Sequence, residues 1–93
     1  MRVLCVIDMQ NDFIDGALGT KEATAIVENV KAKIDLYRKN NDAVIFTRDT
    51  HTEEYMNTQE GRNLPVPHCI KNTKGWEIST ELSTEGSVII DKP

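Results

Sequence analysis

Three short apolar runs, rich in β-branched residues, most constrain what this chain can fold into. They occupy residues 2–8, 43–47 and 87–91, with the sequences RVLCVID, AVIFT and SVIID. A continuous apolar run of this length is typical of a strand that is buried on both faces. A helical pattern separates the first two runs and a long crossover separates the last two, which favours parallel order. The sequence therefore predicts an α/β fold built on a parallel sheet.

One amphipathic helix is predicted between the first two runs, from about Ala23 to Lys39. The preceding stretch MQNDFIDGALGT contains Asn, Asp and Gly and indicates a loop. Residues 50–73 show no sustained period, and such a long irregular segment in a compact domain is usually functional. Short turns are expected at Glu53–Asn57 and at residues 76–82. The apolar positions of the helix are Ala23, Ile26, Val27, Val30, Ile34 and Tyr37.

The predicted sheet needs more cover than one helix supplies, because parallel sheets carry helices on both faces. The 93 residues allow a single domain. We therefore expect residues 1–93 to form the N-terminal part of one larger α/β domain. The alternative is a small domain that is completed by dimerisation, so we expect either a homo-oligomer or a missing C-terminal half.

The charge balance excludes some classes of partner. The chain has 11 Lys and Arg residues against 15 Asp and Glu residues, a net charge of -4. Nucleic acids and anionic membranes both require a basic face, so neither is expected as a partner. No apolar run approaches the roughly 20 residues that span a bilayer, and no secretory signal pattern is present. Two cysteines do not make a disulfide framework, so a cytoplasmic setting is expected.

Chemically useful side chains follow the predicted strands. Asp8 ends the first strand, Asp49 and His51 follow the second, and Lys92 follows the third. Ligands of parallel sheets bind at the carboxyl ends of the strands, so these groups should meet at one edge. A carboxylate at Asp8 could act as a base beside the cation of Lys92, which would stabilise a thiolate. The alternatives are an Asp8 that binds loop amides and a solvated Lys92.

The D-x-H pair predicts a metal site. Residues two apart in extended chain point to the same side, which places Asp49 and His51 together. With His68 from the following loop as a third ligand, the set suits zinc or a similar divalent ion. The alternative is an Asp that caps a turn and a His on a hydrated loop.

The other candidates are less specific. Cys5 lies within the first strand, where we expect buried packing rather than nucleophilic chemistry. Cys69 directly follows His68, and it is a poor nucleophile candidate because adjacent residues usually point apart. Phe13 either forms the wall of a ligand pocket or anchors its loop in the core.

Four segments together resemble the nicotinamidase/isochorismatase-like cysteine hydrolases. They are VIDMQNDFIDGALG, FTRDTH, LPVPHCIKNTKGWEI and VIIDKP, in that order along essentially the whole chain. The combination of D-x-Q-x-D-F with D-x-H and P-H-C is specific. The resemblance implies a three-layer, doubly wound, Rossmann-like α/β fold, of which the first three strands are present.

The resemblance also implies roles for individual residues. Asp8 and Lys92 match two members of a catalytic Asp-Lys-Cys triad. Asp49, His51 and His68 match the metal ligands of the metal-dependent amidases, in which the ion orients the pyridine nitrogen of nicotinamide. Phe13 matches an aromatic residue that packs against the substrate ring, with Gln10 beside it as a substrate-binding candidate.

The nucleophilic cysteine has no match in this chain, because the family carries it well after the lysine. The implied function is therefore hydrolysis of a small carboxamide to an acid and ammonia, with zinc as the expected metal and the nucleophile outside residues 1–93. Two alternatives remain. The chain could belong to an isochorismatase-like hydrolase of another small substrate, or to a non-catalytic homologue that binds a metal or a partner.

Overall fold

The structure is a computed structural model that describes residues 2–58, 61–62, 64 and 66–93. Within the described residues, two α-helices lie between the first and second of three strands, and short 3₁₀ turns lie in the long segment after the second strand. In chain order the elements are β1 (Val3–Ile7), α1 (Asn11–Ile14), α2 (Lys21–Lys39), β2 (Ala43–Asp49), η1 (Glu53–Asn57), η2 (Lys74–Trp76) and β3 (Val88–Lys92).

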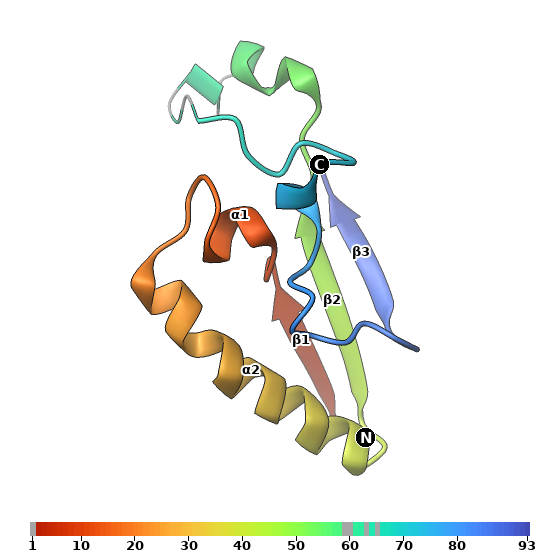
Figure 1. The fold of residues 1–93 in the computed structure, drawn as a ribbon. Helices are drawn as coiled ribbons and strands as arrows, with labels where there is room; N and C mark the ends of the chain where they lie inside the picture. The colour runs from red at the N-terminus through yellow and green to blue at the C-terminus, as the bar shows by residue number, and fades with distance from the viewer. Residues whose placement is uncertain (1, 59–60, 63, 65) are drawn as a thin grey trace.

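The three strands form one parallel sheet in the order β1-β2-β3, which confirms the predicted fold class. Strand β2 lies in the centre: Val6 of β1 is opposite Phe46, and Phe46 is opposite Ile89 of β3. All three carboxyl ends therefore point the same way, toward the segment that follows β2 (Figure 1). This topology brings residue 8 and residue 92 to one edge of the sheet.

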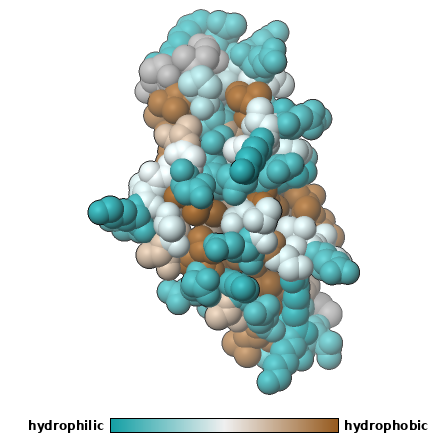
Figure 2. All heavy atoms as spheres, viewed as in Figure 1, coloured by the Kyte–Doolittle hydropathy of each residue, from teal (hydrophilic) through white to brown (hydrophobic). Residues whose placement is uncertain are grey.

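For the residues that the structure describes, the hydrophobic core lies on one face of the sheet. Val6, Val44 and Phe46 point from the strands toward Val27 and Ile34 of α2, and all are nearly inaccessible to solvent. Residues 77–87 cross the same face in front of the strands (Figure 1) and add Leu82 to this core. From this side hydrophilic side chains cover most of the surface, with hydrophobic ones between them in its middle part (Figure 2).

The prediction that the strands are buried on both faces is wrong for the described residues. Val3 and Ile7 of β1 are 52% and 62% exposed, and Val88 and Ile90 of β3 are 62% and 47% exposed. These side chains are exposed because α2 and residues 77–87 pack on the opposite face of the sheet. Cys5 shares the open face and is exposed, which overturns the expected buried packing of this thiol.

The predicted helix is confirmed as α2, with an earlier start. It begins at Lys21 because the side chain of Thr20 accepts a hydrogen bond from the backbone N–H of Ala23, a standard N-cap. The predicted apolar stripe holds at Val27 and Ile34, whereas Ile26 is 45% exposed. Among the described residues, neither α2 nor any other helix has the length and apolar character to cross a membrane.

The remaining differences concern short elements. The expected loop before α2 contains the four-residue helix α1, which carries Phe13. The turn at Glu53–Asn57 is confirmed as η1, whereas the turn expected at residues 76–82 begins earlier, as η2 at Lys74. Strand β3 extends through Lys92, so this residue lies in the strand rather than after it.

Candidate active site and metal centre

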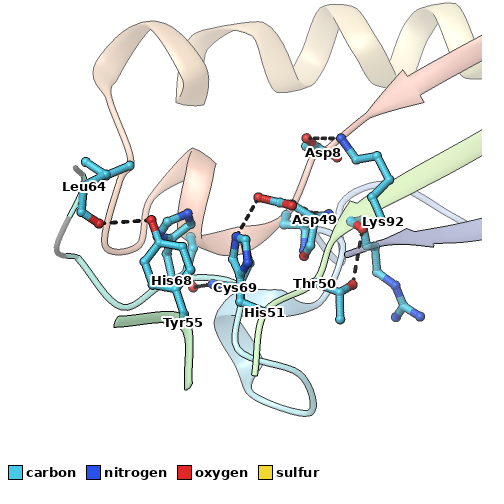
Figure 3. Close-up of polar contacts among 12 residues, drawn as sticks. Asp8, Asp49, Thr50, His51, Tyr55, Leu64, His68, Cys69 and Lys92 are labelled. Carbon is cyan, nitrogen blue, oxygen red and sulfur yellow. Dashed lines mark hydrogen bonds and ion pairs between the residues drawn. The ribbon is translucent and has the colours of Figure 1, made fainter. Parts of the chain in front are cut away.

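Asp8 and Lys92 meet at the carboxyl edge of the sheet although 84 positions separate them. The Lys92 Nζ atom donates a hydrogen bond to Asp8 Oδ2 over 2.8 Å (Figure 3). The hydroxyl of Thr47 donates to the other carboxylate oxygen of Asp8 over 2.9 Å. Asp8 has a φ of 53°, a left-handed conformation that turns the chain out of β1 directly into this site. The sequence expectation that the two groups pair is thus realised in the structure.

The environment keeps Lys92 charged. The hydrogen bond to Asp8 raises the pKa of Lys92 above its ordinary value of 10.5, and the negative charges of Asp8 and Asp49 act in the same direction. The side chain of Lys92 is 42% exposed, so solvent screens part of this attraction. An ammonium group beside a carboxylate is suited to stabilising a nearby anion while the carboxylate accepts a proton.

Neighbouring contacts fix the place of Lys92 in the sheet. Arg48 forms an ion pair with Asp91, with Nε 2.6 Å from Oδ1, and its guanidinium lies 3.8 Å from the centre of the Trp76 ring. The backbone N–H of Thr50 donates to the carbonyl of Lys92 over 2.7 Å. These contacts hold the end of β3 in register with the end of β2.

Asp49, His51 and His68 form the one cluster of possible metal ligands found among the described residues, with donor atoms all within 4.8 Å of one another. His51 Nε2 lies 3.0 Å from Asp49 Oδ2. Two donors that bind one zinc ion tetrahedrally lie about 3.3 Å apart, so this spacing is close to that of a shared ion. His51 and His68 are 8% and 3% exposed. One carboxylate and two imidazoles fit a divalent ion and leave further coordination positions open.

A hydrogen bond fixes the orientation of the His68 ring. Its Nδ1 atom lies 2.6 Å from the carbonyl oxygen of Val66, so Nδ1 carries the proton. The Nε2 atom then presents its lone pair, the usual arrangement of a metal-binding histidine whose other ring nitrogen is held by a carbonyl.

Aromatic rings enclose the two histidines. Tyr55 of η1 lies 4.4 Å from His51 and 5.0 Å from His68, measured between ring centres. Phe13 of α1 packs edge-on against His68 at 5.6 Å and remains partly exposed. Tyr55 was missed as a site residue, because its sequence position indicates a turn and nothing more. The position of Phe13 is compatible with the wall of a ligand pocket, and its contact with substrate stays a prediction.

Gln10 is fully buried, and its side-chain amide binds backbone groups rather than facing open space. Its Nε2 atom donates to the carbonyl oxygens of Asp49 and Trp76 over 2.9 and 2.7 Å, and its Oε1 atom accepts from the N–H of Asp49 over 2.8 Å. Gln10 therefore ties the backbone of Asp49 to η2. Direct substrate binding by this residue stays a prediction, and its geometry favours a positioning role.

We expect Gln10→Leu to destabilise the fold by about 2–4 kcal/mol, because it removes the Gln10 hydrogen bonds of three backbone groups, one buried and two partly buried. Asn11→Leu is the matched control, since the Asn11 amide makes one exposed hydrogen bond, to the carbonyl of Lys74, and should cost under about 1 kcal/mol. Urea unfolding of both variants measures the difference. Equal losses would contradict the assignment of the larger cost to burial.

Cys69 directly follows His68 of the candidate ligand cluster, and its thiol is fully buried. Burial, together with the charges of Asp12, Asp49 and Asp8, raises the pKa of Cys69 to about 12. A thiol of this kind is not available for attack. This supports the expectation that Cys69 is not the nucleophile.

Comparison with known proteins identifies the family. The isochorismatase domain model matches residues 2–93. The nicotinamidase/pyrazinamidase of Mycobacterium tuberculosis (strain ATCC 25618 / H37Rv) is 28% identical over 92 residues, which cover 90% of this chain and 47% of that protein. The structure of the pyrazinamidase of Pyrococcus horikoshii in complex with zinc is 38% identical with a TM-score of 0.81, over 97% of this chain and 50% of that one.

Further structures agree. The nicotinamidase/pyrazinamidase of Bacillus subtilis is 29% identical with a TM-score of 0.83, over 97% of this chain and 55% of that one. The chain thus spans about half the length of the relatives it matches. The family model covers every strand of the sheet and all the candidate site residues described above. On this match, the chain belongs to the isochorismatase family.

Proposed function

We propose that residues 1–93 carry the acid, the lysine and the metal centre of an amidohydrolase that converts a nicotinamide-like carboxamide to its acid and ammonia. The observation that carries the proposal is the convergence of two groups of residues on one edge of the sheet. The Asp8–Lys92 pair and the cluster of Asp49, His51 and His68 lie side by side there, with Asp49 between the lysine and His51 (Figure 3).

The proposed nucleophile is a cysteine thiol outside residues 1–93. Two observations support this placement: Cys69 is fully buried, and Cys5 lies in the middle of β1, away from the carboxyl edge where Asp8 sits. Asp8 accepts the thiol proton, and the ammonium of Lys92 stabilises the resulting thiolate. The thiolate attacks the carboxamide carbon and forms a C–S bond. Ammonia leaves with the proton that Asp8 held, and water then cleaves the thioester to release the acid and restore the thiol.

The metal centre and Phe13 bind and orient the substrate. A divalent ion, when bound, supplies a Lewis acid that orients a ring nitrogen of the substrate. Asp49, His51 and His68 would hold that ion. Phe13 lies against His68 with part of its ring accessible, where a flat aromatic substrate can stack on it. Small carboxamides are the named substrates of the relatives, which adds support from outside the structure.

The test uses the complete protein that contains residues 1–93. We expect it to release ammonia from nicotinamide and to form nicotinic acid in equal amounts, measured by a coupled ammonia assay and by chromatography. Benzamide, which lacks the ring nitrogen, is the matched control substrate and should react at least about tenfold more slowly, since it loses one oriented contact. If no carboxamide tested yields ammonia while zinc still binds, a non-catalytic metal-binding function replaces the proposal.

A further inference from the structure

Asp12 has no role in the function described so far, although it is part of the D-x-Q-x-D-F segment. It lies on α1, and its Oδ2 atom accepts a hydrogen bond from the backbone N–H of Cys69 over 2.7 Å, across 57 positions of sequence. Its Oδ1 atom lies 3.4 Å from the backbone nitrogen of Ala17. The carboxylate thus binds peptide groups, and the short contact reaches the loop that carries His68.

The Cys69 peptide connects Asp12 with both histidines. Cys69 directly follows His68, and its own carbonyl accepts a hydrogen bond from the N–H of His51 over 2.9 Å. The carbonyl of His51 in turn accepts from the N–H of Lys71 over 2.8 Å, so residues 51 and 70 form a parallel bridge. A single chain of hydrogen bonds therefore runs from the Asp12 carboxylate through Cys69 to His51.

The Cys69 backbone adopts an uncommon conformation to make these bonds. Its φ is 50°, in the left-handed region that residues other than Gly, Asn and Asp seldom adopt. The conformation lets the N–H of Cys69 point to Asp12 while its carbonyl points to His51. A charged acceptor is well suited to hold such a peptide, since hydrogen bonds to a carboxylate are stronger than those to a neutral oxygen.

Gly75 supplies an independent observation about the same carboxylate. A Cβ atom placed on Gly75 of η2 would overlap both carboxylate oxygens and the Cγ atom of Asp12. The absence of a side chain at position 75 is therefore what gives the Asp12 carboxylate its space. The fold thus brings α1 and η2, which are distant in the sequence, together around the Asp12 carboxylate.

We propose that Asp12 is a positioning residue of the metal centre: its carboxylate fixes the Cys69 peptide and thereby sets His68 and His51 toward Asp49. The inference rests on the proposed function in one respect: Asp49, His51 and His68 must bind a divalent ion. It assigns Asp12 no contact with metal or substrate. Substitution of residues that hold metal ligands in place typically weakens metal binding 10–100-fold, which sets the size of the expected effect.

Three variants of the complete protein test the inference through zinc and cobalt binding. Asp12→Asn keeps the shape of the side chain but leaves one acceptor oxygen instead of two. Its amide NH₂ group would then face the backbone N–H of either Cys69 or Ala17. Gly75→Ala displaces the same carboxylate from the other side. Asp15→Asn makes the same chemical change three residues away, at an exposed position, and is the matched control. Circular dichroism of the metal-free proteins selects a temperature at which all of them are folded.

Zinc affinity is measured by competition with a chromophoric chelator, and the visible absorption of bound Co²⁺ reports the ligand geometry. We expect Asp12→Asn and Gly75→Ala to weaken zinc binding about 10–100-fold and to change the Co²⁺ spectrum, with Asp15→Asn within twofold of the unsubstituted protein. A zinc affinity within twofold in Asp12→Asn would overturn the positioning role and leave the metal centre intact. An unsubstituted protein that binds no zinc would overturn the metal centre itself, and this inference with it.

Discussion

Lys92→Ala is expected to lower kcat/KM for nicotinamide about 10³-fold, which corresponds to about 4 kcal/mol of transition-state stabilisation. The Nζ atom of Lys92 lies 2.8 Å from Asp8 Oδ2, and its loss leaves the carboxylate with the Thr47 hydroxyl as its remaining described side-chain partner. The cation proposed to stabilise the thiolate is then absent. The loss should fall on kcat more than on KM, because the role proposed for Lys92 concerns the nucleophile rather than the substrate.

Lys74→Ala is the matched control, because it removes the same charge from an exposed residue of η2. We expect its kcat/KM to stay within twofold. A double substitution adds a sharper test: if Asp8 and Lys92 act as one unit, Asp8→Asn with Lys92→Ala should be little slower than the slower single variant. Independent, multiplicative losses would contradict the proposed pair.

The pH dependence of this pair has a definite sign. Because the hydrogen bond to Asp8 raises the pKa of Lys92 above 10.5, Lys92 keeps its charge below that pH and can pair with the Asp8 carboxylate. The stabilisation that the Lys92 charge provides is lost only as the pH rises through the raised value in the folded protein. We therefore expect any loss of activity between pH 7 and 10 to come from a group other than Lys92, such as the proposed nucleophilic thiol.

The pairing across 84 positions illustrates what the sequence could predict. Parallel order follows from apolar runs that are separated by a helix and a crossover, and parallel order alone brings strand ends to one edge. Asp8, Asp49 and Lys92 were found in this way. The D-x-H spacing then placed His51 beside Asp49, as the 3.0 Å separation of their side chains confirms.

The parts that were missed or wrong have physical reasons too. A four-residue helix such as α1 is too short to show a hydrophobic period. An apolar run does not reveal which face of a strand is covered, so the expected burial of Cys5 was wrong. The hydrogen bonds of Gln10 and Asp12 go to peptide groups at distant positions, and no residue pattern marks a peptide group as a partner. Their roles therefore became visible only in three dimensions.

His68→Ala is expected to weaken zinc binding about 10³-fold, beyond the 10–100-fold typical of residues that merely hold a ligand. One ring nitrogen of His68 lies in the cluster, and Nε2 is the one that can offer a lone pair because Nδ1 donates to the carbonyl of Val66. His51→Ala should have a similar effect. Glu54→Gln is the control, since it removes an exposed carboxylate from the neighbouring η1 and should leave zinc affinity within twofold.

The competing interpretation of His68 is a core histidine, whose role is packing between Phe13 and Tyr55. The two interpretations can be separated by a substitution that keeps an aromatic ring of similar shape but removes the ring nitrogens. His68→Phe restores the aromatic packing but offers no lone pair, so a ligand role predicts that it binds zinc as poorly as His68→Ala while recovering thermal stability. Zinc competition and thermal unfolding of the metal-free variants measure both quantities. If the zinc affinity of His68→Phe is within threefold of that of the unsubstituted protein, His68 is a core residue. The third ligand beside Asp49 and His51 would then be another residue.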